Sequence, residues 1–142
     1  MITKPLASFI SFCAVVVTAV GQLTAAEKPE LLAQTAAEQW LTQVDAGKFA
    51  ESWQSAAAFF KGAVTEAQWK TALDAFRKPL GAMVSRKLKS AKYTKTAPGA
   101  PDGEYVILQF ESSFANKKEA VETVTPMLDK DGKWKVSGYF IK

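Results

Sequence analysis

The strongest structural signal in the sequence is an alternation of apolar and polar residues between positions 104 and 113. Val106, Leu108 and Phe110 fall on one face of the extended chain, whereas Ile107 and Gln109 fall on the other. A period of two, with β-branched and aromatic residues behind a Pro- and Gly-containing turn, is typical of a half-buried β-strand. We therefore expect this segment to be the central strand of one antiparallel sheet.

The same period of two continues through the second half of the chain, after Gly81. Short connections favour an antiparallel meander. Pro126 lies inside the third strand, and because proline has no N–H for the ladder, it predicts a bulge or an unpaired edge there. The four predicted strands cover residues 83–94, 104–113, 119–129 and 134–141.

The segment before Gly81 has helical periodicity, with apolar residues recurring every three or four positions. Each predicted helix carries one tryptophan on its apolar stripe: Trp40, Trp53 and Trp69. Three tryptophans aimed at one interior either line a ligand pocket or simply fill the core. The predicted helices cover residues 29–46, residues 49–60, and the segment from a capping box at Thr65 and Gln68 to Phe76.

Helices followed by a curved sheet predict an α+β fold, with three N-terminal helices packed on one face of a curved four-stranded antiparallel meander. By the same alternation, Tyr105 and Tyr139 are expected on the opposite, outer face. The residues expected to face the helices are Val84, Leu88, Val106, Leu108, Phe110, Val124, Leu128, Trp134, Val136 and Phe140.

Two charged residues interrupt this apolar face. Arg86 lies between Val84 and Leu88, and Glu122 lies two positions before Val124. Simple hairpin pairing places Arg86 opposite Phe110 and Phe110 opposite Glu122, in one row across the sheet. Because an unpaired buried charge is very costly, each charge needs the other, solvent or a ligand. The pair is either a structural ion pair or the lining of a pocket mouth, where Arg86 holds a carboxylate or phosphate.

The first 26 residues are interpreted as a secretory signal peptide, with an uncleaved membrane anchor as the alternative, and residues 27–142 are expected to form a single domain. Lys4 supplies the positive start, and an apolar run follows at residues 9–20, too short to span a membrane. Small residues at positions 24–26 are typical of a cleavage site. We therefore expect a periplasmic or secreted protein with no stable membrane span after cleavage.

The residue types exclude several kinds of chemistry. Histidine is absent from the sequence, and Cys13, the one cysteine, lies inside the predicted signal peptide. Because these residues are the commonest general base, thiol nucleophile and metal ligands, a His-based triad and a zinc site are excluded. We expect no cofactor, no metal and no catalytic residue of these types.

The charge is unevenly spread along a mildly basic chain, whose net charge is +4. No acidic residue occurs from Arg77 to Lys95, a segment that is rich in basic residues. Such a strand either meets an anionic partner or is a solvated edge protected by lysines. Nucleic acid is not expected as a partner, since Tyr93 is the one aromatic residue in the run. The basic residues are Arg77, Lys78, Arg86, Lys87, Lys89, Lys92 and Lys95.

Several stretches resemble a bacterial family of small secreted proteins known as domain of unknown function 4019. They include residues 64–69, 77–81, 98–105, 114–117 and 131–134, and they span nearly the whole mature chain. The resemblance implies a bacterial envelope protein but no activity, cofactor or catalytic residue. The order of elements is also similar to the nuclear transport factor 2-like and cystatin-like cone folds, which include both ligand-binding modules and enzymes.

We therefore expect a non-enzymatic protein that binds a small molecule or an envelope protein in the cavity between helices and sheet. The ligand-binding candidates are Arg86, Glu122, Phe110, Trp40, Trp53 and Trp69. The alternative is a cone-pocket lyase, isomerase or hydrolase, with Glu122 as base and Arg86 as electrostatic stabiliser. A homodimer through the outer sheet face is a further expectation, with Tyr105, Ile107 and Tyr139 serving that face.

Overall fold

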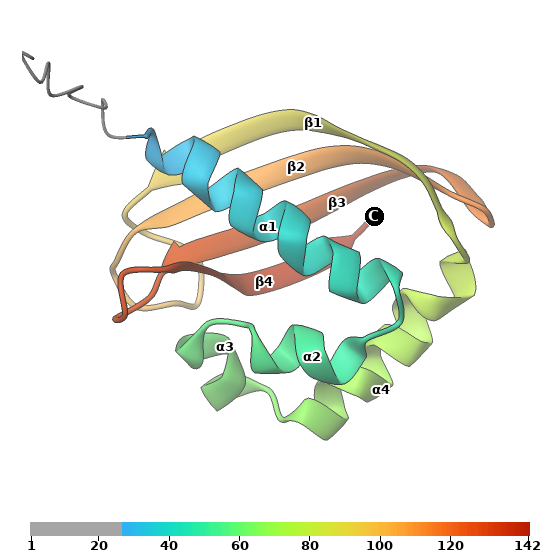
Figure 1. Cartoon of the computed structure of the whole chain (residues 1–142), viewed down its shortest axis with the longest axis horizontal. Coiled ribbons are helices and arrows are strands. Elements are labelled where there is room, and N and C mark those ends of the chain that lie inside the picture. The colour runs from blue at the N-terminus through green and yellow to red at the C-terminus, as the bar shows by residue number, and fades with distance from the viewer. Residues whose placement is uncertain (1–26) are drawn as a thin grey trace, which may run out of the picture.

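The computed structural model describes residues 27–142, so the predicted signal peptide lies outside the described residues. Helices come first and strands follow, as the change of period predicts (Figure 1). The elements are α1 (Pro29–Asp45), α2 (Phe49–Gln54), α3 (Ala58–Ala63), α4 (Glu66–Phe76), the short 3-10 helix η1 (Lys78–Leu80), β1 (Met83–Thr94), β2 (Tyr105–Phe114), β3 (Lys117–Leu128) and β4 (Trp134–Ile141).

The four strands form one antiparallel meander in the order β1-β2-β3-β4, which confirms the α+β class. Helix α1 lies diagonally across one face of the sheet and contacts all four strands (Figure 1). Helices α2, α3 and α4 form a second group on the β4 side, where α2 packs between α1 and α4. The predicted capping box at Thr65 and Gln68 begins α4.

The predicted helix at residues 49–60 is divided into α2 and α3, which is a correction to the sequence analysis. Ala57 has an extended backbone, and its N–H donates to the Val136 carbonyl of β4 over 2.8 Å. The next N–H, of Ala58, donates to the Asp129 carboxylate over 2.9 Å. The alanine run favours a helix locally, but these two long-range hydrogen bonds hold the chain against the sheet and interrupt it.

The core-facing parity of β2 is confirmed, because Val106, Leu108 and Phe110 are buried. The predicted pairing of Phe110 with Glu122 is also present. The pairing of Arg86 with Phe110 is wrong, since Leu88 lies opposite Phe110 and Arg86 lies opposite Ser112. The pairing of Thr94 with Tyr105 and an extra residue, Lys89, in β1 together set this register.

Two further bulges move residues that were placed by simple alternation. Val84 is the extra residue of a β1 bulge and is 68% exposed, so its predicted place in the core is wrong. In β4, Ser137 is the extra residue beside Pro126, as the missing proline N–H predicts. Beyond that bulge the parity is reversed. Tyr139 is buried, whereas Phe140 is 49% exposed, so both predictions were wrong.

Tyr105 keeps the outward parity of its strand but is fully buried, so its predicted exposure is wrong. The loop between β1 and β2 covers it, and the Tyr105 hydroxyl donates to the Pro101 carbonyl. Of the three residues expected to serve a dimer face, Ile107 alone stays partly exposed.

Candidate functional site

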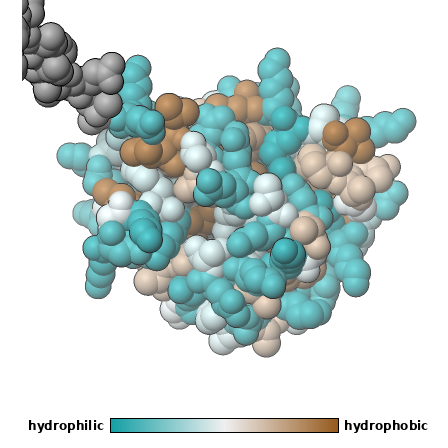
Figure 2. Space-filling model, viewed as in Figure 1, coloured by the Kyte–Doolittle hydropathy of each residue, from teal (hydrophilic) through white to brown (hydrophobic). Residues whose placement is uncertain are grey.

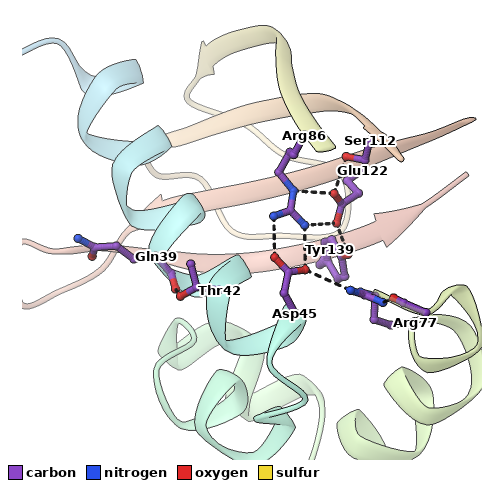
Figure 3. A network of polar contacts seen from close by, with 9 residues as sticks. Gln39, Thr42, Asp45, Arg77, Arg86, Ser112, Glu122 and Tyr139 are labelled. Carbon is purple, nitrogen blue, oxygen red and sulfur yellow. Dashed lines mark hydrogen bonds and ion pairs between the residues drawn. The ribbon is translucent and has the colours of Figure 1, made fainter. Parts of the chain in front are cut away.

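The candidate site is a polar network enclosed between the end of α1 and the sheet (Figure 3). Asp45 is the last residue of α1, Arg86 lies on β1 and Glu122 lies on β3. Each of these charged side chains lies on the inward-facing side of its helix or strand. The structure therefore brings together the two predicted charges and adds Asp45, which the sequence analysis did not single out.

Arg86 makes two fork-shaped contacts at once. Its Nε and Nη2 donate to Glu122 Oε1 and Oε2 over 2.7 and 3.1 Å. Its Nη1 and Nη2 donate to Asp45 Oδ2 and Oδ1 over 2.8 and 3.1 Å. Such bidentate pairs combine charge with fixed geometry. Arg86 therefore joins the C-terminal end of α1 to β1 and β3.

Glu122 is fully buried, and both of its oxygens already accept hydrogen bonds. Besides Arg86, Ser112 Oγ donates to Oε1 over 2.6 Å, and the Tyr139 hydroxyl donates to Oε2. Two donors on each oxygen leave little accepting capacity for a substrate. This saturation favours a structural role for the carboxylate over a role as general base.

Arg77, the residue after α4, completes the network on its other side. Its Nη2 donates to Asp45 Oδ1 over 3.3 Å, and its Nη1 donates to the Gly81 carbonyl over 2.7 Å. The guanidinium carbon lies 4.5 Å from the centroid of the Phe114 ring, a cation–π distance. Two guanidinium groups thus balance two carboxylates, so the buried cluster has no net charge.

The surroundings fix the protonation of two members. Burial favours the neutral form of Arg86, but the hydrogen bonds that Arg86 donates to Asp45 and Glu122 outweigh it and raise the pKa of Arg86. Burial, followed by the negative charge of Glu122, raises the pKa of Tyr139. Tyr139 therefore remains a neutral hydrogen-bond donor at physiological pH.

Two of the three candidate tryptophans fill the interior. Trp40 and Trp69 are buried with ring centroids 6.1 Å apart, and Tyr139 packs edge-on against both. Their indole N–H groups donate to Ser52, at its carbonyl and its hydroxyl. Trp53 is half-buried and donates to the Val64 carbonyl instead. Phe110 is buried beneath the same helices.

The hollow between helices and sheet lies elsewhere, along α1 and the start of β4. A groove of about 530 Å³ has an apolar lining that includes Pro29, Leu32, Leu128 and Trp134. It adjoins a smaller hollow of about 180 Å³ that reaches Trp40. The space-filling view shows hydrophobic surface beside the start of α1 (Figure 2). Neither Arg86 nor Glu122 lines this groove.

A further hollow of about 600 Å³ lies at the opposite end of the strands. Its charged lining mixes both signs: Lys87, Glu111, Lys118, Glu119 and Lys142. No three His, Cys, Asp or Glu side chains within residues 27–142 are grouped to hold a metal ion. In the same part of the chain, no helix has the length and apolar character needed to cross a membrane.

Three members of the network, Asp45, Tyr139 and Arg77, carry only partial signals in the sequence. Asp45 precedes Ala46 and Gly47, a pattern that also ends helices, so its charge had no distinguishing context. Tyr139 was assigned to the wrong face because the β4 bulge is set by pairing with Pro126. Arg77 stands among other basic residues, and nothing in that run separates a buried guanidinium from solvated lysines.

Comparison with known proteins bears out the resemblance to one sequence family. No curated protein matches the chain. The sequence model of a family described as a protein of unknown function, DUF4019, matches residues 36–139, which include most of α1 and nearly the whole sheet. The chain therefore belongs to the DUF4019 family.

Proposed function

We propose that this protein is a non-enzymatic binding module of the bacterial envelope, which recognises a partner protein through the groove between α1 and β4. The observation that carries the proposal is the groove itself, an apolar hollow between the helical layer and the sheet. It takes apolar side chains of a partner along the face of α1 that begins at Pro29 and Leu32.

The dimensions of the groove support a binding role. Its lining on α1 extends from Pro29 to Gln43 when the smaller hollow is included. At 1.5 Å per residue this is roughly 20 Å of helix, and the main hollow is within the size range of ligand sites. Leu32 is 40% exposed at its edge. Burying such a side chain against an apolar partner is favourable.

The filled interior supports a protein partner over a small molecule held among the tryptophans. Trp40, Trp69 and Tyr139 already contact one another where such a ligand would lie. The alternative enzyme would use Glu122 as base and Arg86 as stabiliser. It requires the buried Glu122 to exchange one of its present donors for a substrate, and we find no observation that favours this.

The placement in the envelope rests on the first 26 residues. A positive charge at Lys4, an apolar run at residues 9–20 and small residues at 24–26 together favour export and cleavage. We infer that the mature protein works in the periplasm or outside the cell, with neither nucleic acid nor a cofactor as its partner.

Site-specific photo-crosslinking tests the proposal in the producing cells. A photoreactive phenylalanine at Leu32 is expected to give a discrete protein adduct that is identified by mass spectrometry. The same group at Glu38, which is exposed on α1 away from the groove, is the matched control. Equal adducts at both positions, or a small molecule retained in the groove with no protein adduct, would contradict a protein partner.

A further inference from the structure

A second surface, separate from the groove, runs along the free edge of β1. This strand of 12 residues is the first in the sheet order, so one of its edges has no neighbouring strand within residues 27–142. Helices α2 to α4 gather on the opposite side of the sheet, beside β4 (Figure 1). Ser90, Ala91 and Lys92 in the middle of β1 are exposed.

The edge is strongly positive. Lys87, Lys89, Lys92 and Lys95 are all exposed, and none of the ion pairs found in the described part of the chain involves them. The acidic residues nearest in the pairing are Glu111, the β2 partner of Lys87, and Glu104, which accepts a hydrogen bond from the Tyr93 hydroxyl of β1. Four lysines beside two carboxylates leave this edge with a net positive charge.

The edge also presents main-chain hydrogen-bonding groups. Residues 90–94 pair one by one with residues 105–109 of β2, so this stretch of β1 is regular. In an antiparallel strand, every second residue turns its N–H and C=O away from its neighbour. Those groups on the outer edge of β1 form a template for a further strand.

Lysines on an edge are a known protection against unwanted pairing, and their charge also favours a partner strand of opposite sign. A second copy of β1 would bring four lysines against four lysines and be repelled. An acidic strand gains attraction at the same positions, in addition to the main-chain hydrogen bonds. The bulge at Lys89 limits the regular stretch but leaves residues 90–94 available.

We propose that the free edge of β1 docks an extended acidic segment of a partner protein by strand addition. Its backbone pairs with residues 90–94, and its carboxylates lie on the outer face of the sheet, which carries Lys87 and Lys92 of β1. Lys89, at the bulge, and Lys95, just after the strand, add to the positive charge around it. This surface lies on the strand farthest from β4 in the sheet order, and none of its four lysines lines the groove.

Titration with designed peptides tests the proposal. The probe is a ten-residue peptide that alternates valine or threonine with glutamate, and the control peptide has lysine in place of each glutamate. We expect the acidic peptide to bind, to weaken about tenfold between 50 and 300 mM salt as exposed charges are screened, and to slow amide exchange at residues 90–94. The lysine peptide is expected not to bind.

Charge reversal supplies the matched comparison. The variant K87E/K89E/K92E/K95E is expected to bind the acidic peptide at least about tenfold more weakly than wild type and to bind the lysine peptide. The variant K28E/K48E/K118E/K130E makes the same change of charge at exposed positions off β1 and is expected to retain binding. Circular dichroism checks that both variants fold.

Three results would overturn the proposal. One is equal loss of binding in the two charge-reversed variants, which would mean nonspecific attraction. Another is peptide binding without amide protection in β1, which would exclude strand addition. The third is charge-dependent binding to vesicles of anionic lipid while neither peptide binds, which would assign the lysines to a membrane surface.

Discussion

Glu122 is the residue whose surroundings most constrain the account of this protein. Its carboxylate is fully buried and accepts from Arg86, Ser112 and Tyr139. Removing one member of a buried ion pair leaves an uncompensated charge, which is costly. The side chain is therefore expected to matter for folding first.

The substitution Glu122→Gln is expected to destabilise the protein by about 3 to 5 kcal/mol, because Arg86 keeps its charge but loses a carboxylate partner. Urea unfolding measures the change. The control Glu111→Gln, at an exposed position of the neighbouring strand, is expected to stay within about 0.5 kcal/mol. Equal stabilities for the two variants would show that the network contributes little.

The substitution Tyr139→Phe tests the hydroxyl that donates to Glu122. We expect a loss of about 1 to 3 kcal/mol at neutral pH, because a buried carboxylate loses one donor. Because the pKa of Tyr139 is raised in the folded protein, this loss of stability depends on pH. The stabilisation that the hydroxyl gives to the folded protein is fully present below the ordinary tyrosine pKa of about 10. This stabilisation is lost as the pH rises above that value.

When unfolding is measured between pH 7 and 11, the difference in free energy of unfolding between wild type and Tyr139→Phe should therefore stay constant up to about pH 9. Above pH 10 the difference should shrink. Tyr93 and Tyr105 are present in both proteins and cancel. A difference that grows with pH would mean that the folded protein favours the ionised phenol, contrary to the structure.

At this scale the sequence predicted the contact of Arg86 with Glu122, because charged residues on an apolar face must be paired. It did not predict Asp45 or Tyr139. Asp45 is brought in by the angle at which α1 crosses the sheet, which residue spacing does not specify. Tyr139 depends on the single extra residue in β4.

Among the elements, the break between α2 and α3 depends on hydrogen bonds across the fold. Asp129, in the turn after β3, accepts from the Ala58 N–H at the start of α3. This hydrogen bond, followed by that of the Lys130 N–H, lowers the pKa of Asp129. The carboxylate therefore acts as a cap for α3 that is supplied from 71 residues away in the chain.

The substitution Asp129→Ala is expected to cost about 1 kcal/mol, a usual value for loss of an N-terminal cap. Amide exchange should accelerate selectively at Lys61 and Val64, whose N–H groups bond within α3. Asp131→Ala, in the same turn but bonded to Lys133 and Lys135, is the control. Uniform acceleration across all helices would contradict a local cap.

The pH dependence of this cap has the opposite sign to that of Tyr139. The pKa of Asp129 is lower in the folded protein than in the unfolded chain. The carboxylate therefore stabilises the fold fully above the unfolded pKa of about 3.9, and this stabilisation is lost as the pH falls through the folded pKa. The difference in free energy of unfolding between wild type and Asp129→Asn should vanish in that acid range. A constant difference down to pH 2 would exclude the charge as its cause.

The sequence predicted element types well, since each depends on a local period. It predicted the strand containing Pro126 and the bulge beside it from the missing N–H. It failed where a long-range contact overrides local preference. The alanines at 56–58 favour a helix by themselves, and only the neighbouring sheet makes Ala57 extended.

For the whole molecule, the α+β arrangement follows from helical periodicity giving way to a period of two. The groove does not follow, because it depends on how closely α1 and β4 approach. The two surfaces proposed for partners differ in place: the apolar groove lies between α1 and the end of the sheet at Leu128 and Trp134, and the lysine-rich surface follows the free edge of β1.

The lysines of β1 are expected to keep the molecule from pairing with itself. The double variant Lys89→Thr and Lys92→Thr removes two charges from the free edge and adds residues that favour strands. Light scattering after size exclusion should detect dimers or larger species. Lys48→Thr with Lys118→Thr is the control, and self-association of both variants alike would remove the edge from the explanation.

The central claim is that partners are recognised at the groove, while Arg86 and Glu122 hold the fold together. Native mass spectrometry of protein released from the envelope of its producing cells tests this, with wild type beside Leu32→Asp and Glu122→Gln. We expect a protein complex that is lost in Leu32→Asp and retained by the folded fraction of Glu122→Gln. A small molecule bound to wild type and Leu32→Asp, but absent from folded Glu122→Gln, would contradict it.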